Sequence, residues 1–160
     1  MHIRRATEAD LEQMWAIFRA VVTPGDTLPF PDDTDRDTFR SQWLDGQKMT
    51  FVAADDGRVL GMYQLGANHS GRGSHVANAT YLVAPAEQGK GVGRALVEHS
   101  LGEAARGGYL AMQFNFVVST NCAAVALYEK LGFTVVGTLP KAFRHKAHGL
   151  VDAYVMYRFL

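Results

Sequence analysis

The sequence predicts an α/β protein in which one sheet carries helices on both faces. Its 160 residues suit a single domain, which we place at residues 1–160. Hydrophobic residues make up 48% and charged residues 20%, which is close to the average for globular proteins with a buried core. Segments of helical and of strand periodicity alternate along the chain without an internal repeat. These three observations favour one α/β unit over a disordered, coiled-coil or repeat protein.

Charge and cysteine content exclude several classes of function. The 16 Lys and Arg residues balance 16 Asp and Glu residues, so no net charge draws the chain to nucleic acid or to anionic lipid. The single cysteine cannot form an intramolecular disulfide, and the first residues lack the apolar stretch of a secretory signal. No apolar run approaches the roughly 18 residues of a membrane span. We therefore expect a cytoplasmic protein without nucleic-acid or membrane partners.

The N-terminal part begins with a short strand at residues 3–5. Thr7 and Asp10 form a capping-box pattern, which predicts the start of a helix. One face of this helix is apolar, with Leu11, Met14, Trp15, Phe18 and Val22. Residues 23–31 hold three of the five prolines, so we expect a long loop that borders a binding site. A second helix follows, with the apolar residues Phe39, Trp43 and Leu44.

The central part predicts a hairpin and a further strand. Two β-type runs, at residues 50–54 and 59–65, flank an Asp-Gly pair that is typical of a tight hairpin turn. Residues 66–74 are rich in Gly and Ser and are expected to form a flexible connection. A longer strand is predicted at residues 75–83.

The C-terminal part predicts two helices and three strands. A glycine cluster leads into a helix with Leu96, Val97, Leu101 and Ala104, and Gly107 with Gly108 ends it. The elements expected after it are a strand at 110–118, a helix at 120–131, and closing strands at 133–139 and 151–159.

The glycine cluster at residues 88–94 is the most informative segment. Glycines between a strand and a helix let the backbone approach a ligand, and the free N–H groups of a helix start suit phosphate. The common dinucleotide fingerprint fails, because it would need glycine at Arg94 or at Leu96. A P-loop fails too, because Gly89-Lys90 is not followed by Ser or Thr. Taken alone, the cluster is better explained as a glycine-rich turn that caps a helix.

A second segment favours a ligand-binding loop over a simple helix-capping turn. The pattern Gln88-x-x-Gly91-x-Gly93 resembles the Q/R-x-x-G-x-G/A signature of the Gcn5-related N-acetyltransferases. Residues 121–133, with Asn121, Leu127-Tyr128 and Gly132-Phe133, are similar to the downstream helix and turn of that superfamily. The resemblance implies a mixed, mainly antiparallel sheet of six to seven strands, splayed between the fourth and fifth, with about four flanking helices. It also implies transfer of an acetyl group from acetyl-CoA to an amine by direct attack in a ternary complex.

The resemblance assigns the cofactor site. In the family the glycine loop holds the pyrophosphate of acetyl-CoA, and the preceding strand, here residues 79–83, pairs with the pantetheine arm. A backbone N–H near Leu82 or Val83 is expected to polarise the thioester carbonyl. The implied cofactor-binding residues are Leu82, Val83, Gln88, Gly89, Lys90, Gly91, Val92, Gly93, Arg94 and Asn121. No metal is expected.

Tyr128 is the implied catalytic residue. Its phenol can protonate the departing thiolate of CoA, since a phenol with a pKa near 10 is a competent donor at neutral pH. Without the surrounding motif, Tyr128 would be read as a core aromatic residue beside Leu127. The general base is not identified, because Asn78 stands where some relatives place a glutamate. Deprotonation of the amine would then go through water or precede binding.

A narrower resemblance concerns the acceptor. Residues 75–79 and 114–121 are similar to strands of the yeast acetyltransferases that detoxify the proline analogue azetidine-2-carboxylate. This implies that Asn78 and Asn115 bind the substrate, although both can also serve as hydrogen-bonded residues of a splayed strand pair. The acceptor is expected to be a small amine, with amino acids and proline analogues first. Residues that could line its pocket or simply pack are Phe30, Trp43, Phe143 and Arg144.

Other candidate chemistry is weaker. Cys122 lacks an identifiable base, so covalent catalysis is not favoured. A metal site at His145, His148 and Asp152 has no strict ligand pattern. The acidic residues Asp32, Asp33, Asp35 and Asp37 could attract an amine or could form the solvated start of a helix.

Rival interpretations remain open for the whole chain. These are a protein N-terminal or lysine acetyltransferase, a non-catalytic acyl-CoA sensor, and a purely structural role through dimerisation by the closing strands. A homodimer is also compatible with catalysis.

Overall fold

Seven strands form one sheet in the computed structural model, which describes residues 1–160. They are β1 (His2–Arg5), β2 (Met49–Asp55), β3 (Arg58–Ala67), β4 (Val76–Val83), β5 (Ala111–Val118), β6 (Thr134–His145) and β7 (Gly149–Phe159). The helices are α1 (Leu11–Val22), α2 (Arg36–Trp43), α3 (Val92–Arg106) and α4 (Cys122–Lys130), with 3-10 turns η1 (Glu8–Asp10), η2 (Gly71–Gly73) and η3 (Pro85–Glu87). The strand order is β1-β2-β3-β4-β5-β7-β6. The expected fold class is confirmed.

The sheet opens between its fourth and fifth strands. β4 and β5 are the only parallel neighbours, and they pair only at Val76 with Ala111 and at Ala77 with Met112. Beyond this point β5 continues to pair with β7, while β4 continues to pair with β3. The rest of β4 therefore faces a gap instead of a strand, as the resemblance implied.

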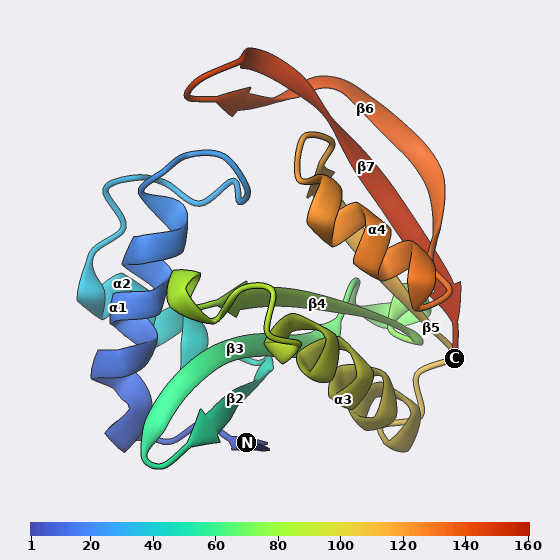
Figure 1. Ribbon diagram of the computed structural model, residues 1–160. Coiled ribbons are helices and arrows are strands. Elements are labelled where there is room, and N and C mark those ends of the chain that lie inside the picture. Colours follow the sequence, from blue (N-terminus) through green and yellow to red (C-terminus); the bar gives the residue numbers. More distant parts are fainter.

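Helices cover both faces of the sheet (Figure 1). Alternate residues of β2 point in opposite directions, so Val52 joins the core beneath α1 and α2 while Phe51 joins the core beneath α3. Leu82 of β4 belongs to the first core and Leu96 of α3 to the second. No helix of this fold has the length and apolar character needed to cross a membrane.

The start of α1 depends on a buried carboxylate. Asp10 accepts hydrogen bonds from both terminal nitrogens of Arg4, at 2.7 and 2.8 Å, and from the Thr7 backbone N–H at 2.8 Å. The capping box predicted from Thr7 and Asp10 is therefore present. It forms the turn η1, and the α-helix proper begins one residue later, at Leu11.

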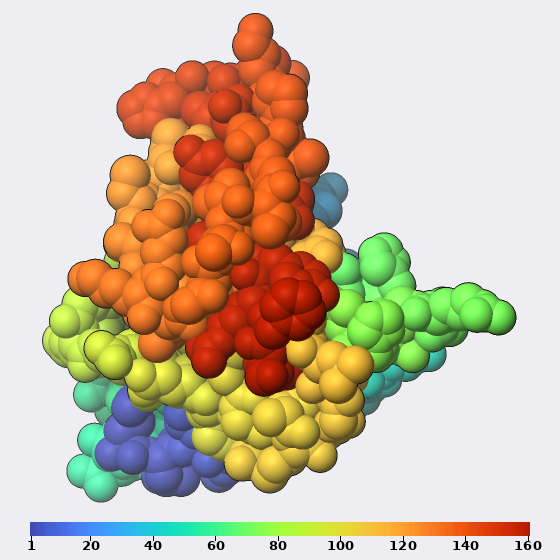
Figure 2. All heavy atoms as spheres, turned by 90° about the vertical axis from the view of Figure 1, so that its right-hand side faces the viewer, coloured from blue at the N-terminus to red at the C-terminus, as the bar shows by residue number.

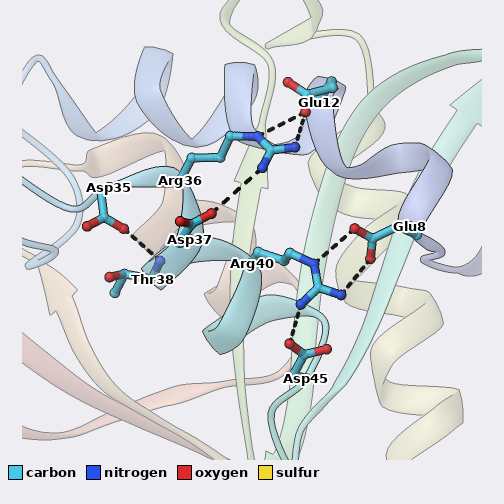
Figure 3. A network of polar contacts seen from close by, with 8 residues as sticks. All are labelled: Glu8, Glu12, Asp35, Arg36, Asp37, Thr38, Arg40 and Asp45. Atoms are coloured by element: carbon cyan, nitrogen blue, oxygen red, sulfur yellow. Dashed lines mark hydrogen bonds and ion pairs between the residues drawn. The ribbon is translucent and has the colours of Figure 1, made fainter.

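Ion pairs join α2 to η1 and to the first turn of α1 (Figure 3). Arg40 reaches both carboxylate oxygens of Glu8, at 2.9 and 3.1 Å, and Arg36 pairs with Glu12. Asp35 caps α2 by accepting from the Thr38 N–H at 2.7 Å. Asp35 therefore belongs to the start of a helix, as the simpler of the two interpretations proposed.

One connection and the two closing strands differ from the sequence-based expectation. The flexible segment predicted at 66–74 is shorter, because β3 extends through Gly66 and Ala67, which pair with β4. The closing strands are longer than 133–139 and 151–159, since β6 runs to His145 and β7 begins at Gly149. Pro140 does not end β6, because it lies in the irregular stretch between Leu139 and Phe143, where the register with β7 shifts and no ladder hydrogen bond is lost. The hairpin of β6 and β7 rises above the body of the molecule (Figure 2).

Candidate active site

A cavity of about 780 Å³ occupies the gap between β4 and β5. Its walls come from the end of α1 and the following loop, from β4, from the turn before α3, from β5 and from α4. The residues predicted for the site that line it are Phe30, Asn78, Leu82, Val83, Gln88, Gly89, Gly93, Asn115, Asn121 and Tyr128. The fold thus brings together most of the predicted site, from segments far apart in the sequence.

Four predicted cofactor residues lie beside the cavity without lining it. The Val92 side chain is buried in the core beneath α3, so only its backbone can serve a ligand. Lys90 pairs with Glu87 at 3.2 Å, and Arg94 pairs with Glu98 at 2.8 Å. Gly91 is the N-cap of α3.

The glycine loop has the geometry of an anion site. Gly89 and Gly91 adopt φ values of +74° and +86°, which are left-handed conformations that residues with a Cβ rarely adopt. The Ala95 N–H bonds to the Gly91 carbonyl, so the N–H groups that precede it at the start of α3 have no partner within the helix. These free donors and the positive end of the helix dipole can hold phosphate oxygens.

The edge of β4 distinguishes between the two predicted donors to the thioester. The Ala84 N–H donates to the Leu60 carbonyl at 2.9 Å, so this position points toward β3. Alternation along an antiparallel ladder then directs Leu82 toward β3 and Val83 toward the gap. The backbone N–H of Val83 therefore faces the cavity, whereas that of Leu82 faces the neighbouring strand.

Tyr128 lies where α4 meets the cavity. Its ring is 4.5 Å from that of Phe114 and 6.2 Å from that of Tyr81, measured between centroids. The hydroxyl makes no hydrogen bond within the protein, and burial raises the pKa of the phenol well above its usual value of 10. Tyr128 is therefore protonated throughout the physiological range and can donate a proton to a group in the cavity.

Amide side chains gather where β4 and β5 separate. Asn78 donates to the Gln113 carbonyl at 3.0 Å. Gln113 Nε2 donates to Asn115 Oδ1 at 2.8 Å, and Asn115 in turn donates to Asn68 Oδ1 at 2.7 Å. Both predicted substrate residues thus also bridge segments around the splay. Asn121 likewise has a structural contact, since it caps α4 by accepting from the Ala124 N–H at 3.3 Å.

Sequence reasoning missed Asp26 and Thr27 in the loop after α1. Asp26 is the only carboxylate among the residues that line the cavity, and it forms no ion pair or side-chain hydrogen bond. Thr27 Oγ1 is buried without a hydrogen-bond partner. Asp26 is therefore available to an acceptor, whereas the Thr27 oxygen is shielded from the cavity. The proline-rich loop indicated a site border, but its sequence did not show which side chains face inward.

Of the other candidates, only His145 lines the main cavity. Trp43 is buried in the core beneath α2, and Phe143 and Arg144 line a second cavity of about 590 Å³. Cys122 is exposed and does not line the main cavity. His145 lines it, but its Nδ1 accepts from the backbone N–H groups of residues 147 and 148. No three His, Cys, Asp or Glu side chains lie together in a way that could hold a metal ion.

Comparison with known proteins finds relatives over most of the chain. The profile of the acetyltransferase (GNAT) family matches residues 11–133. The N-acetyltransferase aca1 of Schizosaccharomyces pombe is 41% identical over 103 residues, which are 63% of this chain and 49% of aca1. The L-methionine sulfoximine/L-methionine sulfone acetyltransferase of Salmonella typhimurium is 30% identical over 146 residues, covering 88% of this chain and 84% of that protein. The chain thus spans about half the length of aca1.

Solved structures share the fold. A GCN5-related N-acetyltransferase from Kribbella flavida superposes with a TM-score of 0.96 at 42% identity, covering 99% of this chain and 97% of that one. The Salmonella typhimurium protein yncA, solved with its cofactor acetyl-CoA, has a TM-score of 0.86 at 30% identity and covers 100% and 94% of the two chains.

Proposed function

The chain belongs to the acetyltransferase (GNAT) family, and from this premise we propose that it transfers an acetyl group from acetyl-CoA to a small primary or secondary amine. One observation carries the proposal. The unpaired edge of β4, the free N–H groups at the start of α3 and the Tyr128 phenol border one cavity. Thioester transfer needs these three functions, namely donor binding, carbonyl polarisation and a proton for the thiolate.

The residues present fit acetyl-CoA, which supplies the activated acetyl group. The left-handed backbone at Gly89 and Gly91 leaves space that a Cβ would occupy, and no other atom lies within 4 Å of that position. The backbone donors at the start of α3 would hold the pyrophosphate, with Gln88, Lys90 and Arg94 beside them. The open edge of residues 79–83 would take the pantetheine amides as an added strand.

Two groups of the chain would act on the thioester. The Val83 N–H would donate to the carbonyl oxygen, where negative charge develops as the amine attacks. Tyr128 would give its proton to the sulfur as the C–S bond breaks, and its raised pKa keeps that proton available. The attacking amine must be neutral. Asp26 can bind the ammonium form and accept its proton directly or through water.

We place the acceptor between the loop after α1 and the diverging ends of β4 and β5. Phe30 would cover its apolar part, and Asn78 with Asn115 would bind its polar part. An amino acid or a proline analogue fits these groups. A relative named for acting on methionine sulfoximine and methionine sulfone supports a small acceptor over a peptide.

The test is release of free thiol from acetyl-CoA by the purified protein. Azetidine-2-carboxylate, proline, methionine sulfone, a polyamine, an aminoglycoside and a short peptide would be supplied in separate reactions. Acceleration by small amino acids supports the proposal. Acceleration by the peptide alone would establish a protein acetyltransferase, and acetyl-CoA binding without turnover on any amine would favour a sensor.

We also propose a homodimer through β6. This edge strand pairs only with β7, and it exposes Val135, Val136 and Leu139. An apolar edge strand is a ready partner for a second copy. Light scattering after size exclusion at micromolar concentration tests the proposal, and a monomer would refute it.

A further inference from the structure

A row of residues crosses the sheet where β4 and β5 separate. Lys48 comes directly before β2, and the pairing of Met49 with Leu65 sets it beside Gly66 on β3. Gly66 pairs with Asn78 on β4. The Lys48 amine passes over β3 and donates to Asn78 Oδ1 at 3.2 Å. A side chain from outside the cavity thus contacts a residue that lines it.

Gly66 makes this contact possible. A Cβ at position 66 would lie 2.8 Å from Lys48 Cγ and 3.4 Å from Lys48 Cβ, which is closer than packed carbon atoms approach. The backbone at Gly66 does not have a positive φ, so conformation does not require glycine there. The absence of a side chain is what leaves room for the stem of Lys48.

The amine of Lys48 has no carboxylate partner. None of the ion pairs in the structure includes Lys48, and its one hydrogen bond goes to the neutral amide of Asn78. Much of the Lys48 residue is exposed to solvent. Its amine is nevertheless partly desolvated, which lowers the pKa of that amine. The positive charge behind Asn78 is therefore not neutralised by the protein, whereas Asp26 supplies a negative charge to the cavity lining itself.

The contact also fixes the orientation of the Asn78 amide. An ammonium can only donate, so the oxygen of Asn78 must face Lys48. The nitrogen then faces β5, where one N–H bonds to the Gln113 carbonyl. The other N–H of Asn78 has no hydrogen-bond partner within the protein. A donor backed by a positive charge suits an anionic group and offers nothing to a cationic one.

We propose that Lys48 is a positioning residue that makes the acceptor site select amines carrying a carboxylate or a similar anionic group. It acts through Asn78, in the space that Gly66 provides. This inference rests on the acceptor site of the proposed function. It concerns the choice of acceptor and not the transfer step.

Equilibrium binding to the protein alone tests it, because no turnover is needed. Isothermal titration calorimetry would compare azetidine-2-carboxylate with its carboxamide, and proline with prolinamide. Wild type is expected to bind each acid more tightly than its amide. Lys48→Met keeps an apolar stem over Gly66, and it should weaken the acids about tenfold while leaving the amides unchanged. Lys48→Arg, which keeps the charge, should retain the preference.

Gly66→Ala provides an independent variant that keeps the lysine. Its Cβ displaces the Lys48 stem, so it should reproduce the loss for the acids, and it should add nothing in a Lys48→Met background. Thermal melting of each variant reports folding. Equal binding of acids and amides by wild type, or an equal loss for both in Lys48→Met, overturns the inference. Thiol release tests the proposed function separately, because carboxamide amines can still serve as acceptors when the acid preference is absent.

Discussion

Tyr128 on α4 packs its ring 4.5 Å from that of Phe114 on β5, so the proposed proton donor is held by the strand that diverges from β4. The ring of Tyr81, on the other side of the splay, lies 6.2 Å from the Tyr128 ring. The phenol is thus enclosed by aromatic side chains, which raises its pKa, while its hydroxyl has no protein partner. Packing and proton donation are consequently separable at this residue.

Tyr128→Phe keeps the ring contacts and removes the hydroxyl. We expect thiol release to fall about 100-fold, since loss of a general acid typically costs that much, with acetyl-CoA affinity unchanged. Tyr63→Phe is the matched control, because it removes a buried hydroxyl bonded to His99 at 2.8 Å and lies outside the cavity. For both variants, steady-state kinetics measures thiol release and calorimetry measures the affinity for acetyl-CoA. Unchanged thiol release in Tyr128→Phe would remove the proposed donor.

Gly91→Ala should weaken acetyl-CoA binding. Its φ of +86° costs an alanine about 1 kcal/mol, and relief of that strain would rotate the N–H groups at the start of α3. Gly57→Ala introduces comparable strain at φ +75° in the turn between β2 and β3, also with no neighbouring atom within 4 Å. Both should lower the melting temperature, but only Gly91→Ala should raise the Kd for acetyl-CoA. Equal affinity in the two variants would contradict an anion site at this loop.

Asp26→Asn should raise the KM for amine acceptors about tenfold, because the variant removes the only carboxylate lining the cavity. Asp33→Asn in the same loop removes the same charge outside the cavity, so its KM should stay at the wild-type value. The comparison is made near pH 7, where the amines are protonated. If both variants raise KM equally, the effect comes from the overall charge of the loop and not from Asp26.

Asp10 should make stability depend on pH in the acid range. The hydrogen bonds from Arg4 lower the pKa of Asp10 to about 2, against 3.8 for a free side chain. The contribution, about 2 kcal/mol, is complete above about pH 5 and is lost as the pH falls through 3.8 toward 2. Urea unfolding at several pH values should show wild type more stable than Asp10→Asn at about pH 6, with the difference shrinking below about pH 4. A constant difference would be inconsistent with this linkage.

Local chemistry in the sequence predicted most elements correctly. The Asp-Gly pair after β2 forms the tight turn, with Asp56 and Gly57 at positive φ. Thr7 and Asp10 form their capping box, and the family resemblance carried by residues 88–93 and 121–133 is confirmed by the profile match. These signals depend on neighbours along the chain. The predicted end of β6 was wrong, because the length of this strand depends on its pairing with β7. That pairing continues to His145 and Gly149, which flank a turn of 3 residues.

The sequence by itself determined the fold class, the glycine loop and the candidates for donor binding and proton transfer, because each rests on residue types at short, fixed spacing. Only the tertiary structure decided that Val83 and not Leu82 turns its N–H to the cavity, that Asp26 lines it, and that Lys48 reaches Asn78 over Gly66. These relationships join segments brought together by strand register and by the divergence of β4 from β5. Register depends on pairing between distant parts of the chain, which no local pattern specifies.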